Sequence, residues 1–398
     1  MTRCLALTSI NVCQRQLRQA AAMASAKLQS LNSEPPSVPT TRAWITDAID
    51  SLASEAGSTV ETPMRELCLP GFPNIRFLLK DESVHCTGSL KHRLARSLFL
   101  YALCSGRLRC GQTAIDASSG STAISEAWFA QRLGVPFIAV MPRSTAGAKQ
   151  REVAALGGRC ELVDAGTDPA ARALVLAQEL GACYLDQFGL AGSATDWRGN
   201  NNIAQSILGQ CRELGAGDPA WIICGAGTGG TSATIGRYLR YIGSAARLCI
   251  AEPTGAAFAH GWRSGDRCAQ ASRTTCIEGI GRSRVEPCFA FELVDAVFEI
   301  ADAASIAGIW LLERWTGRRY GGSSGTNLVA ALQLAQAMQT RGESGSVVFL
   351  LCDRGERYDD TLYCPAWLAT QGYDLGPWLQ ALAHGADTGH LRLASASA

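Results

Sequence analysis

The stretch Trp221–Tyr241, WIICGAGTGGTSATIGRYLRY, joins a short apolar run to a glycine-rich turn and then to a helical pattern. Trp221 to Cys224 predicts a buried strand, Gly225 to Thr231 a turn of small residues, and Thr231 to Tyr241 a helix. Small residues let an anion approach the backbone closely, and a helix N-terminus offers it free N–H groups. The stretch therefore predicts one strand–helix unit of a parallel sheet, with an anion site at its turn.

The same alternation of apolar runs and helical patterns continues on both sides of this stretch. Strands are predicted at Ile75–Lys80, Thr113–Ala117, Pro136–Met141, Arg159–Val163, Arg247–Ala251 and Ser346–Leu351, and helices at Arg42–Ala56, Thr122–Leu133, Ala148–Leu156, Pro169–Leu180, Asp302–Thr316 and Thr326–Gln339. Such alternation favours parallel sheets with helices on both faces. Because 398 residues exceed a usual single core, we expect an α/β fold of two doubly wound lobes with a cleft between them.

The chain is expected to divide into four parts. Residues 1–33 carry basic and no acidic side chains, which suits a disordered leader, a targeting peptide or a true start at Met23, and prolines follow it. We favour the disordered leader. The predicted parts are a leader at 1–40, a larger domain at 41–84 and 196–376, a smaller domain at 85–195, and a C-terminal tail at 377–398.

Charge and cysteine content exclude several classes of function. With 36 basic and 35 acidic residues the net charge is +1, so no charged block is present to grip nucleic acid or an anionic membrane. No apolar run approaches the roughly 20 residues that span a bilayer. The 16 cysteines are scattered singly, without zinc-ligand spacing, and Cys224 and Cys249 lie in apolar runs. We therefore predict no metal site, and reduced cysteines in a cytoplasmic protein.

A second turn of small residues, SSGST at Ser118–Thr122, also lies between a predicted strand and a helix. Its backbone amides and hydroxyls at a helix N-terminus favour an anion such as a substrate carboxylate. A serine N-cap, worth about 1 kcal/mol, gives the same pattern and is very common. Taken alone, this turn favours the N-cap.

Lys91 lies in the stretch TGSLKHR, Thr87–Arg93, close to a predicted helix start. Alone, a lysine in this place is more often a solvated surface charge. Two anion-binding turns downstream change the interpretation, because pyridoxal phosphate needs a lysine for its aldehyde, a cradle for its phosphate and a carboxylate site for its amino-acid substrate. The three motifs together predict Schiff-base chemistry at Lys91.

The glycine-rich turn also allows a dinucleotide interpretation. Gly225, Gly227 and Gly230 satisfy the G-x-G-x-x-G pattern, and Glu252 ends the next strand where a ribose-binding acid would stand. The threonines of this glycine-rich turn suit a compact phosphate monoester better than a dinucleotide. An NAD site would also leave Lys91 and the serine-rich turn without a role. An NAD-dependent oxidoreductase therefore stays the less favoured alternative.

Four motifs in this order and spacing resemble those of fold-type II pyridoxal-phosphate enzymes, whose fold is that of the tryptophan synthase β subunit. They are TGSLK at 87–91, SSGST at 118–122, GTGGT at 227–231 and GERY at 355–358. Residues from about 42 to 375 look most like the cysteine synthase and L-cysteine desulfhydrase family. DWRGNNNIA at Asp196–Ala204 and IEGIG at Ile277–Gly281 look like the desulfhydrase branch in particular.

The resemblance implies roles for individual residues. Lys91 would be the catalytic lysine that also holds the cofactor, pyridoxal 5'-phosphate. The other cofactor contacts would be Ser121, Gly227, Thr228, Gly229, Gly230, Thr231 and Asp353, and the substrate would be bound by Ser118, Ser119, Gly120, Thr122 and Gln187.

The sequence also departs from the family pattern. Many synthases have asparagine where Ser121 stands. Asp353-Arg354 occupies a place where relatives present a neutral serine, or an aspartate followed by glycine, near the pyridine nitrogen. Asp353 there would favour a protonated ring and Arg354 an unprotonated one, and both side chains could instead point to solvent. The sequence leaves these alternatives open.

The implied reaction is β-elimination on L-cysteine through an aminoacrylate, giving sulfide, pyruvate and ammonia. The alternative is cysteine synthase-type replacement of O-acetylserine by sulfide, and a non-catalytic binding protein is the rival outside enzymes. The released Lys91 amine would remove the Cα proton, which requires burial and the nearby Arg93 to lower its pKa. The partners implied are a small amino-acid substrate and, by resemblance, a second copy of the chain in a homodimer.

Overall fold

The structure is a computed structural model that describes residues 38–58, 60–198 and 202–393. The predicted leader therefore lies almost wholly outside the described residues, as do residues 199–201 of the desulfhydrase-like segment. The described residues up to Asp47 belong to one unit and those from Ala48 onward to a second, and every strand of the described residues lies in the second. The helix α2, Val38–Ser58, runs from the first unit into the second.

The larger sheet has six strands in the order β1-β2-β10-β7-β8-β9. Its strands are β1 (Met64–Leu67), β2 (Ile75–Asp81), β7 (Trp221–Gly225), β8 (Arg247–Pro253), β9 (Ala296–Ile300) and β10 (Gly345–Leu351). Neighbours pair in parallel except β1, an edge strand that pairs antiparallel with β2. The central strand β10 comes last in the chain, so the sheet is complete only when the C-terminal part of the fold has joined it.

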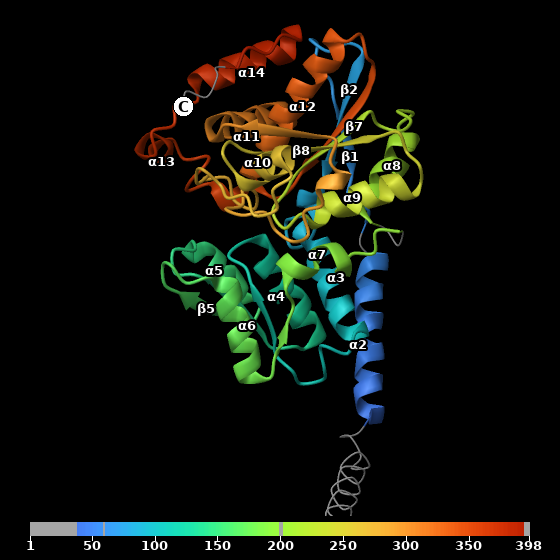
Figure 1. Ribbon diagram of the computed structural model, residues 1–398, viewed down its shortest axis with the longest axis vertical. Coiled ribbons are helices and arrows are strands. Elements are labelled where there is room, and N and C mark those ends of the chain that lie inside the picture. Colours follow the sequence, from blue (N-terminus) through green and yellow to red (C-terminus); the bar gives the residue numbers. More distant parts are fainter. Residues whose placement is uncertain (1–37, 59, 199–201, 394–398) are drawn as a thin grey trace, which may run out of the picture. The chain divides into compact units, whose positions relative to one another are not determined.

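Helices cover both faces of the larger sheet (Figure 1). One face packs against α11 (Asp302–Thr316), α12 (Gly322–Thr340) and α14 (Gly376–Thr388), and the other against α8 (Ile203–Glu213), α9 (Gly230–Tyr241) and α10 (Ala257–Ser264). Successive residues of β10 alternate between the two cores, with Phe349 in the first and Leu350 in the second. Side chains of a strand alternate between its two faces, and both faces of β10 are buried. The strand is therefore apolar along almost its whole length.

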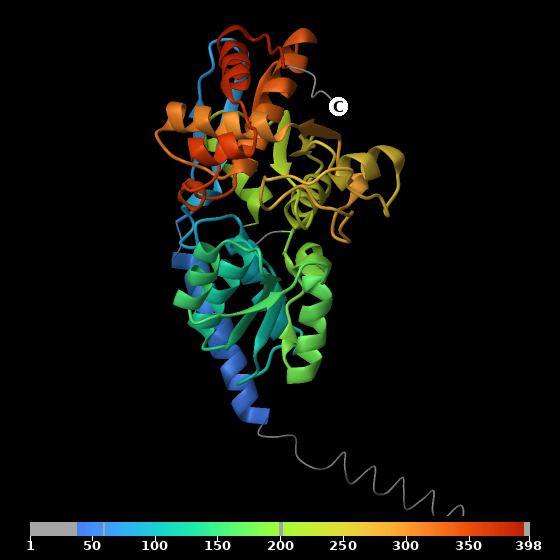
Figure 2. The same ribbon diagram turned by 90° about the vertical axis from the view of Figure 1, so that its left-hand side faces the viewer.

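The smaller sheet is wholly parallel, with the strand order β5-β4-β3-β6 (Figure 2). Its strands are β3 (Ala114–Ala117), β4 (Phe137–Pro142), β5 (Arg159–Val163) and β6 (Cys183–Tyr184). The helices around it are α3 (Lys91–Cys104), α4 (Ser121–Leu133), α5 (Gly147–Ala155), α6 (Pro169–Leu180) and α7 (Gln187–Ala194). The short 3-10 helices are η1 (Glu82–Val84), η2 (Phe291–Leu293) and η3 (Gly355–Tyr358), and α13 (Pro365–Thr370) is a short α-helix.

The α/β fold class with parallel sheets is confirmed, and most predicted elements occur with ends shifted by a few residues. The short strands β1, β6 and β9 were not predicted, because two to five residues carry too little pattern. The helix α12 starts at Gly322, four residues before the prediction, and a side chain at Gly325 would collide with the carbonyl oxygen of Ser305 on α11. The glycines there permit close helix packing.

No helix among the described residues is long and apolar enough to cross a membrane.

Candidate active site

A cavity of about 440 Å³ lies at the carboxyl ends of strands from both sheets. Ser118, Pro142, Gly225 and Cys352 line it, and these residues end or follow β3, β4, β7 and β10. Open α/β sheets bind their ligands in this position. Of the residues predicted for the site, only Gly230 does not line this cavity. The predicted residues that do line it are Lys91, Ser118, Ser119, Gly120, Ser121, Thr122, Gln187, Gly227, Thr228, Gly229, Thr231 and Asp353.

Lys91 is the first residue of α3, and backbone contacts to the end of β10 hold it in place. The N–H of Leu90 donates to the carbonyl of Cys352 at 2.8 Å, and the N–H of Arg354 donates to the carbonyl of Gly88 at 3.0 Å. These bonds flank an antiparallel bridge between Ser89 and Asp353. The helix start that carries the amine is therefore fixed to the opposite wall of the cavity.

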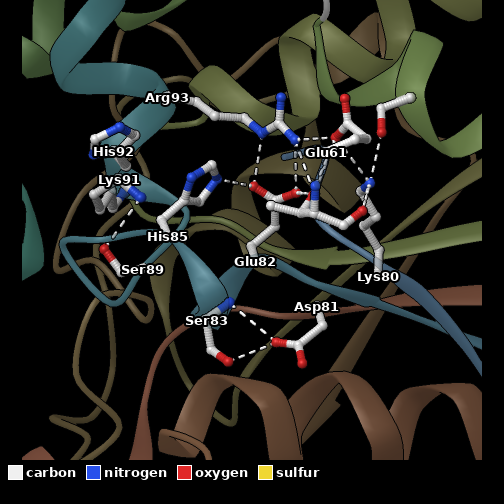
Figure 3. Close-up of polar contacts among 12 residues, drawn as sticks. Glu61, Lys80, Asp81, Glu82, Ser83, His85, Ser89, Lys91, His92 and Arg93 are labelled. Carbon is white, nitrogen blue, oxygen red and sulfur yellow. Dashed lines mark hydrogen bonds and ion pairs between the residues drawn. The ribbon is translucent and has the colours of Figure 1, made fainter. Parts of the chain in front are cut away.

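The Lys91 amine has a lowered pKa. Burial is the largest cause, Cys352 and Asp353 oppose it, and Arg282 adds to the lowering. The expected contribution of Arg93 is wrong: its guanidinium donates to Glu82 at 2.7 Å and to Glu61 at 2.9 Å. Figure 3 shows this side chain extending away from Lys91 toward the two carboxylates. The cation that acts on Lys91 is Arg282, more than 190 residues further along the chain.

The glycine-rich turn after β7 faces the Lys91 amine. A Cβ built on Gly227 would collide with the carbonyl oxygen of Gly279 and would lie 3.9 Å from Lys91 Nζ. Gly229 has a φ of 82°, in the left-handed region that favours glycine, and precedes the first residue of α9. The N–H of Gly230, the first of α9, donates to Thr228 Oγ1 at 3.2 Å, and the next N–H groups of the first turn offer an anion site near Lys91. Gly230 instead faces Ala191 of α7, where a side chain would not fit.

The serine N-cap interpretation of the serine-rich turn is wrong, because the N-cap of α4 is Gly120 and no side chain caps the helix. Ser118 Oγ instead accepts from the N–H of Ala123, inside the first turn of α4, at 3.0 Å. Ser121 Oγ accepts from Arg357 at 3.2 Å and still lines the cavity. The remaining hydroxyls and amides of the turn are left for a ligand.

Gln187 is held beside this turn by β3. Its side-chain amide donates to the carbonyl of Ala117 at 2.7 Å, and its backbone N–H donates to the buried carboxylate of Asp116 at 3.3 Å. Burial raises the pKa of Asp116 to about 6, and burial together with Asp116 raises that of the neighbouring Glu126. One amide hydrogen of Gln187 stays free to donate into the cavity.

Asp353 faces the cavity and Arg354 does not. Asp353 Oδ2 accepts from the hydroxyl of Tyr358 at 2.7 Å, while Oδ1 is buried and has no partner among the described residues. Burial raises the pKa of this carboxyl group. Arg354 donates to the carbonyl of Ser83 at 3.1 Å and to that of His85 at 3.0 Å. The unexpected arginine therefore supports the turn before Lys91 and leaves the cavity to Asp353.

With this geometry in hand, the chain can be compared with known proteins. The sequence pattern of the family described as "Pyridoxal-phosphate dependent enzyme" matches residues 58–353. The chain belongs to this family. Its cofactor is accordingly pyridoxal phosphate, as the motifs predicted.

The pyridoxal-phosphate enzymes most informative for this chain act on sulfur-containing or β-substituted amino acids, according to their names. The L-cysteine desulfhydrase Cds1 of Mycobacterium tuberculosis is 49% identical over 84% of this chain and 92% of its own. A cysteine synthase of Aquifex aeolicus is 28% identical over 79% of this chain and 94% of its own. The crystal structure of an O-ureido-L-serine synthase, 25% identical, covers 79% of this chain and 98% of its own with a TM-score of 0.68.

The cavity fits pyridoxal phosphate on its own geometry. The unpartnered Asp353 Oδ1 gives a ring nitrogen an acceptor. The space at Gly227 is open because the residue has no side chain, and a Cβ there would lie 3.9 Å from Lys91 Nζ. All three residues line the same cavity. The dinucleotide alternative fares worse. The Glu252 carboxylate is buried, accepts the backbone N–H of Ala259, and does not line the cavity.

Several residues of the site were not predicted from the sequence. Lys149 and Glu278 form an ion pair on the cavity wall, Arg282 pairs with Glu286 and covers the ring of Phe188 at 4.5 Å. The motif IEGIG at Ile277–Gly281 indicates the family, and its Glu278 is also the residue that pairs with Lys149. Nothing in the stretch around Lys149 marks a site, since its partners come from distant parts of the chain.

Proposed function

We propose that this pyridoxal-phosphate enzyme eliminates the β-substituent of L-cysteine and releases sulfide, pyruvate and ammonia. The observation that carries this proposal is the similarity to L-cysteine desulfhydrase Cds1, which extends over nearly the whole of both chains. The Lys91 amine at a cavity with two anion-binding turns supports the same chemistry.

Each part of the cavity then has a task. The turn Gly227–Thr231 and the first amides of α9 would hold the cofactor phosphate, Asp353 the ring nitrogen, and Lys91 the aldehyde. The cofactor bound there supplies an electron sink for the substrate's α-carbon. Ser118–Thr122 and Gln187 would bind the substrate carboxylate, and the buried Lys91 amine, with its lowered pKa, would remove the Cα proton. The residues thus divide into anchoring, orienting and proton-transferring groups.

β-Replacement of O-acetylserine by sulfide is the second candidate. Relatives named cysteine synthase, at 28% identity, favour it. Both reactions need the same lysine and the same two turns, so these residues do not distinguish elimination from replacement.

One assay distinguishes the two reactions. Purified holoenzyme is supplied with L-cysteine, and separately with O-acetylserine and sulfide, while sulfide, pyruvate and cysteine are measured. We expect sulfide and pyruvate to appear from cysteine in equal amounts. Exclusive formation of cysteine from O-acetylserine, without sulfide release from cysteine, would reject elimination in favour of replacement.

We also propose that the protein acts in the cytoplasm as a homodimer. Among the described residues 14 cysteines are free, which suits a reducing compartment. The homodimer rests on the family resemblance alone. The division into a larger domain (41–84 and 196–376) and a smaller domain (85–195) is likewise a proposal, and each would contain one of the two sheets.

A further inference from the structure

The cavity contains a second amine besides that of Lys91. Among the described residues that line it, Lys149 is the only other lysine. It lies on α5, beside the smaller sheet, and its side chain is 9% exposed. Burying an amine costs desolvation energy that a surface lysine does not lose. A buried lysine in a ligand cavity is therefore a candidate for a role in the chemistry.

Lys149 is paired on the cavity wall with a carboxylate from a distant loop. Its Nζ contacts Glu278, which lies in the loop between α10 and β9 and has a side chain 47% exposed. The same Nζ lies 5.8 Å from the centre of the Tyr358 ring. Lys149 thus faces the cavity interior while its carboxylate partner reaches solvent, an arrangement that lets protons be exchanged with bulk water.

The other ionisable groups of the lining are already engaged. Tyr358 donates to Asp353, Arg282 is held by Glu286, and the Cys352 thiol donates to the carbonyl of Leu350. Burial raises the pKa of the Cys352 thiol to about 12, and burial also raises that of Tyr358. Among the described residues of the lining, Lys149 is therefore the ammonium donor that is separate from Lys91, the amine that takes the Cα proton.

The proposed elimination needs such a donor at the sulfur. With the substrate carboxylate at Ser118–Thr122 and its α-carbon at Lys91, the β-substituent occupies the rest of the cavity, whose wall includes Lys149 and Glu278. A sulfur that leaves with the electron pair of the Cβ–S bond is stabilised when a proton is delivered to it. A halide leaving group needs no proton.

We propose that Lys149 is the general acid of the reaction and protonates the leaving sulfur, with Glu278 as the carboxylate that keeps it charged. As the Cβ–S bond breaks, its electron pair stays on sulfur, an N–H bond of the Lys149 ammonium breaks, and an S–H bond forms, so that H₂S departs. The electron pair left at Cα forms the Cα–Cβ double bond. The neutral Lys149 amine then regains a proton from water at the Glu278 side. This role rests on the proposed desulfhydrase function.

The charges around Lys149 set the pH range in which it can act. Burial lowers its pKa to about 8, close to the 8.5 of a thiol, Asp353 and Glu152 oppose this lowering, and Arg357 adds to it. The Glu278 carboxylate in contact with the ammonium also favours the charged form. Removing that carboxylate in Glu278→Gln lowers the pKa further, so the ammonium is lost at lower pH. The groups that face Lys149 are Glu278 from the loop, Asp353, Arg357 and Tyr358 from the end of β10 and η3, and Glu152 from its own helix.

The test compares two leaving groups in the same holoenzyme. Lys149→Met and Lys149→Arg are assayed for pyruvate release from L-cysteine and from 3-chloro-L-alanine, with Arg151→Met on the exposed side of the same helix as control. We expect the turnover of cysteine to fall about 10²-fold in both Lys149 variants and that of chloroalanine to change only a few-fold. Arginine keeps the charge and the ion pair but does not give up its proton, so it separates acid chemistry from structure.

Two further results complete the test. In Glu278→Gln the alkaline limb of cysteine turnover should move to lower pH by about one unit. Labelling of Lys149 by acetic anhydride, read by mass spectrometry without substrate, should show the same shift in its pKa. Equal losses with both substrates, or full cysteine turnover in Lys149→Arg, would overturn the role of Lys149. Wild-type enzyme that eliminates chloride but releases no sulfide from cysteine would instead overturn the proposed function itself.

Discussion

Lys80 and Lys91 are both withdrawn from solvent and lie close together in the chain, yet their surroundings differ completely. Lys80 Nζ is surrounded by four oxygen acceptors: Glu61 at 3.2 Å, the carbonyl of Thr62 at 2.6 Å, Ser206 at 2.5 Å and Gln210 at 2.7 Å. Lys91 Nζ makes no hydrogen bond to any described residue and faces the cavity. Figure 3 shows the two amines at opposite ends of the same group of polar residues.

This difference teaches what makes a buried lysine reactive. Burial lowers the pKa of both amines. At Lys80 fixed acceptors occupy all three hydrogens of the ammonium and tie β2 to α8 and to the segment before β1, so it is a structural charge. At Lys91 the protein provides burial without acceptors, which leaves the lone pair available to a carbonyl carbon. The number of fixed acceptors, rather than burial, separates the two roles.

The largest expected effect comes from removing the unpartnered amine. Lys91→Ala should lower turnover by about 10⁴-fold, the upper end for a positioned acid–base group, because nothing else in the cavity replaces it. The variant should also lose covalent attachment of the cofactor, which borohydride reduction followed by mass spectrometry measures. Its free energy of unfolding without cofactor should stay close to that of the wild type. Turnover retained in this variant would remove Lys91 from the chemistry.

Replacing Lys80, whose ammonium is fully hydrogen-bonded, should lower stability rather than turnover. Lys80→Met removes the ammonium and leaves Glu61 with Arg93 and the Thr62 carbonyl with Gln210 as remaining partners. The free energy of unfolding should therefore fall by about 3 kcal/mol, measured by urea denaturation. Turnover per folded, cofactor-loaded molecule should change little. A large loss of turnover with unchanged stability would show that the contrast between the two lysines is wrong.

The smallest effect concerns the acid limb of stability. Burial raises the pKa of Glu61, but Arg93 and Lys80 outweigh it and lower the pKa from 4.5 to about 2. Because the folded value lies below the unfolded one, Glu61 stabilises the fold above pH 4.5, and this contribution is lost as the pH falls toward 2. Glu61→Gln should therefore be less stable at pH 7 and lose less stability on acidification. Parallel pH dependences in urea denaturation would contradict this assignment.

The sequence predicted the parts of the site that depend on neighbours in the chain. Small residues between a strand and a helix identify Ser118–Thr122 and Gly227–Thr231 from local pattern alone, and both turns line the cavity with Lys91. Parallel β-strands place such turns at one edge of a sheet, so the position of the cleft follows as well.

What the sequence did not predict depends on partners far apart in the chain. Arg93 is near Lys91 in sequence but turns to Glu61 and Glu82, while Arg282 comes close only through the fold. The four acceptors of Lys80 and the partner of Lys149 are likewise distant. The orientation of a long charged side chain is decided by such contacts, and residue type and spacing carry no information about them.

The bridge between Ser89 and Asp353 has a consequence for how the enzyme is made. Ser83 and Arg354, which meet beside it, are 271 residues apart in the chain, and β10 must insert between β2 and β7 before they can meet. A nascent chain on the ribosome therefore presents its reactive lysine long before the wall that shields and orients it exists. A complete cofactor site therefore requires that β10 has been synthesised and has joined the sheet.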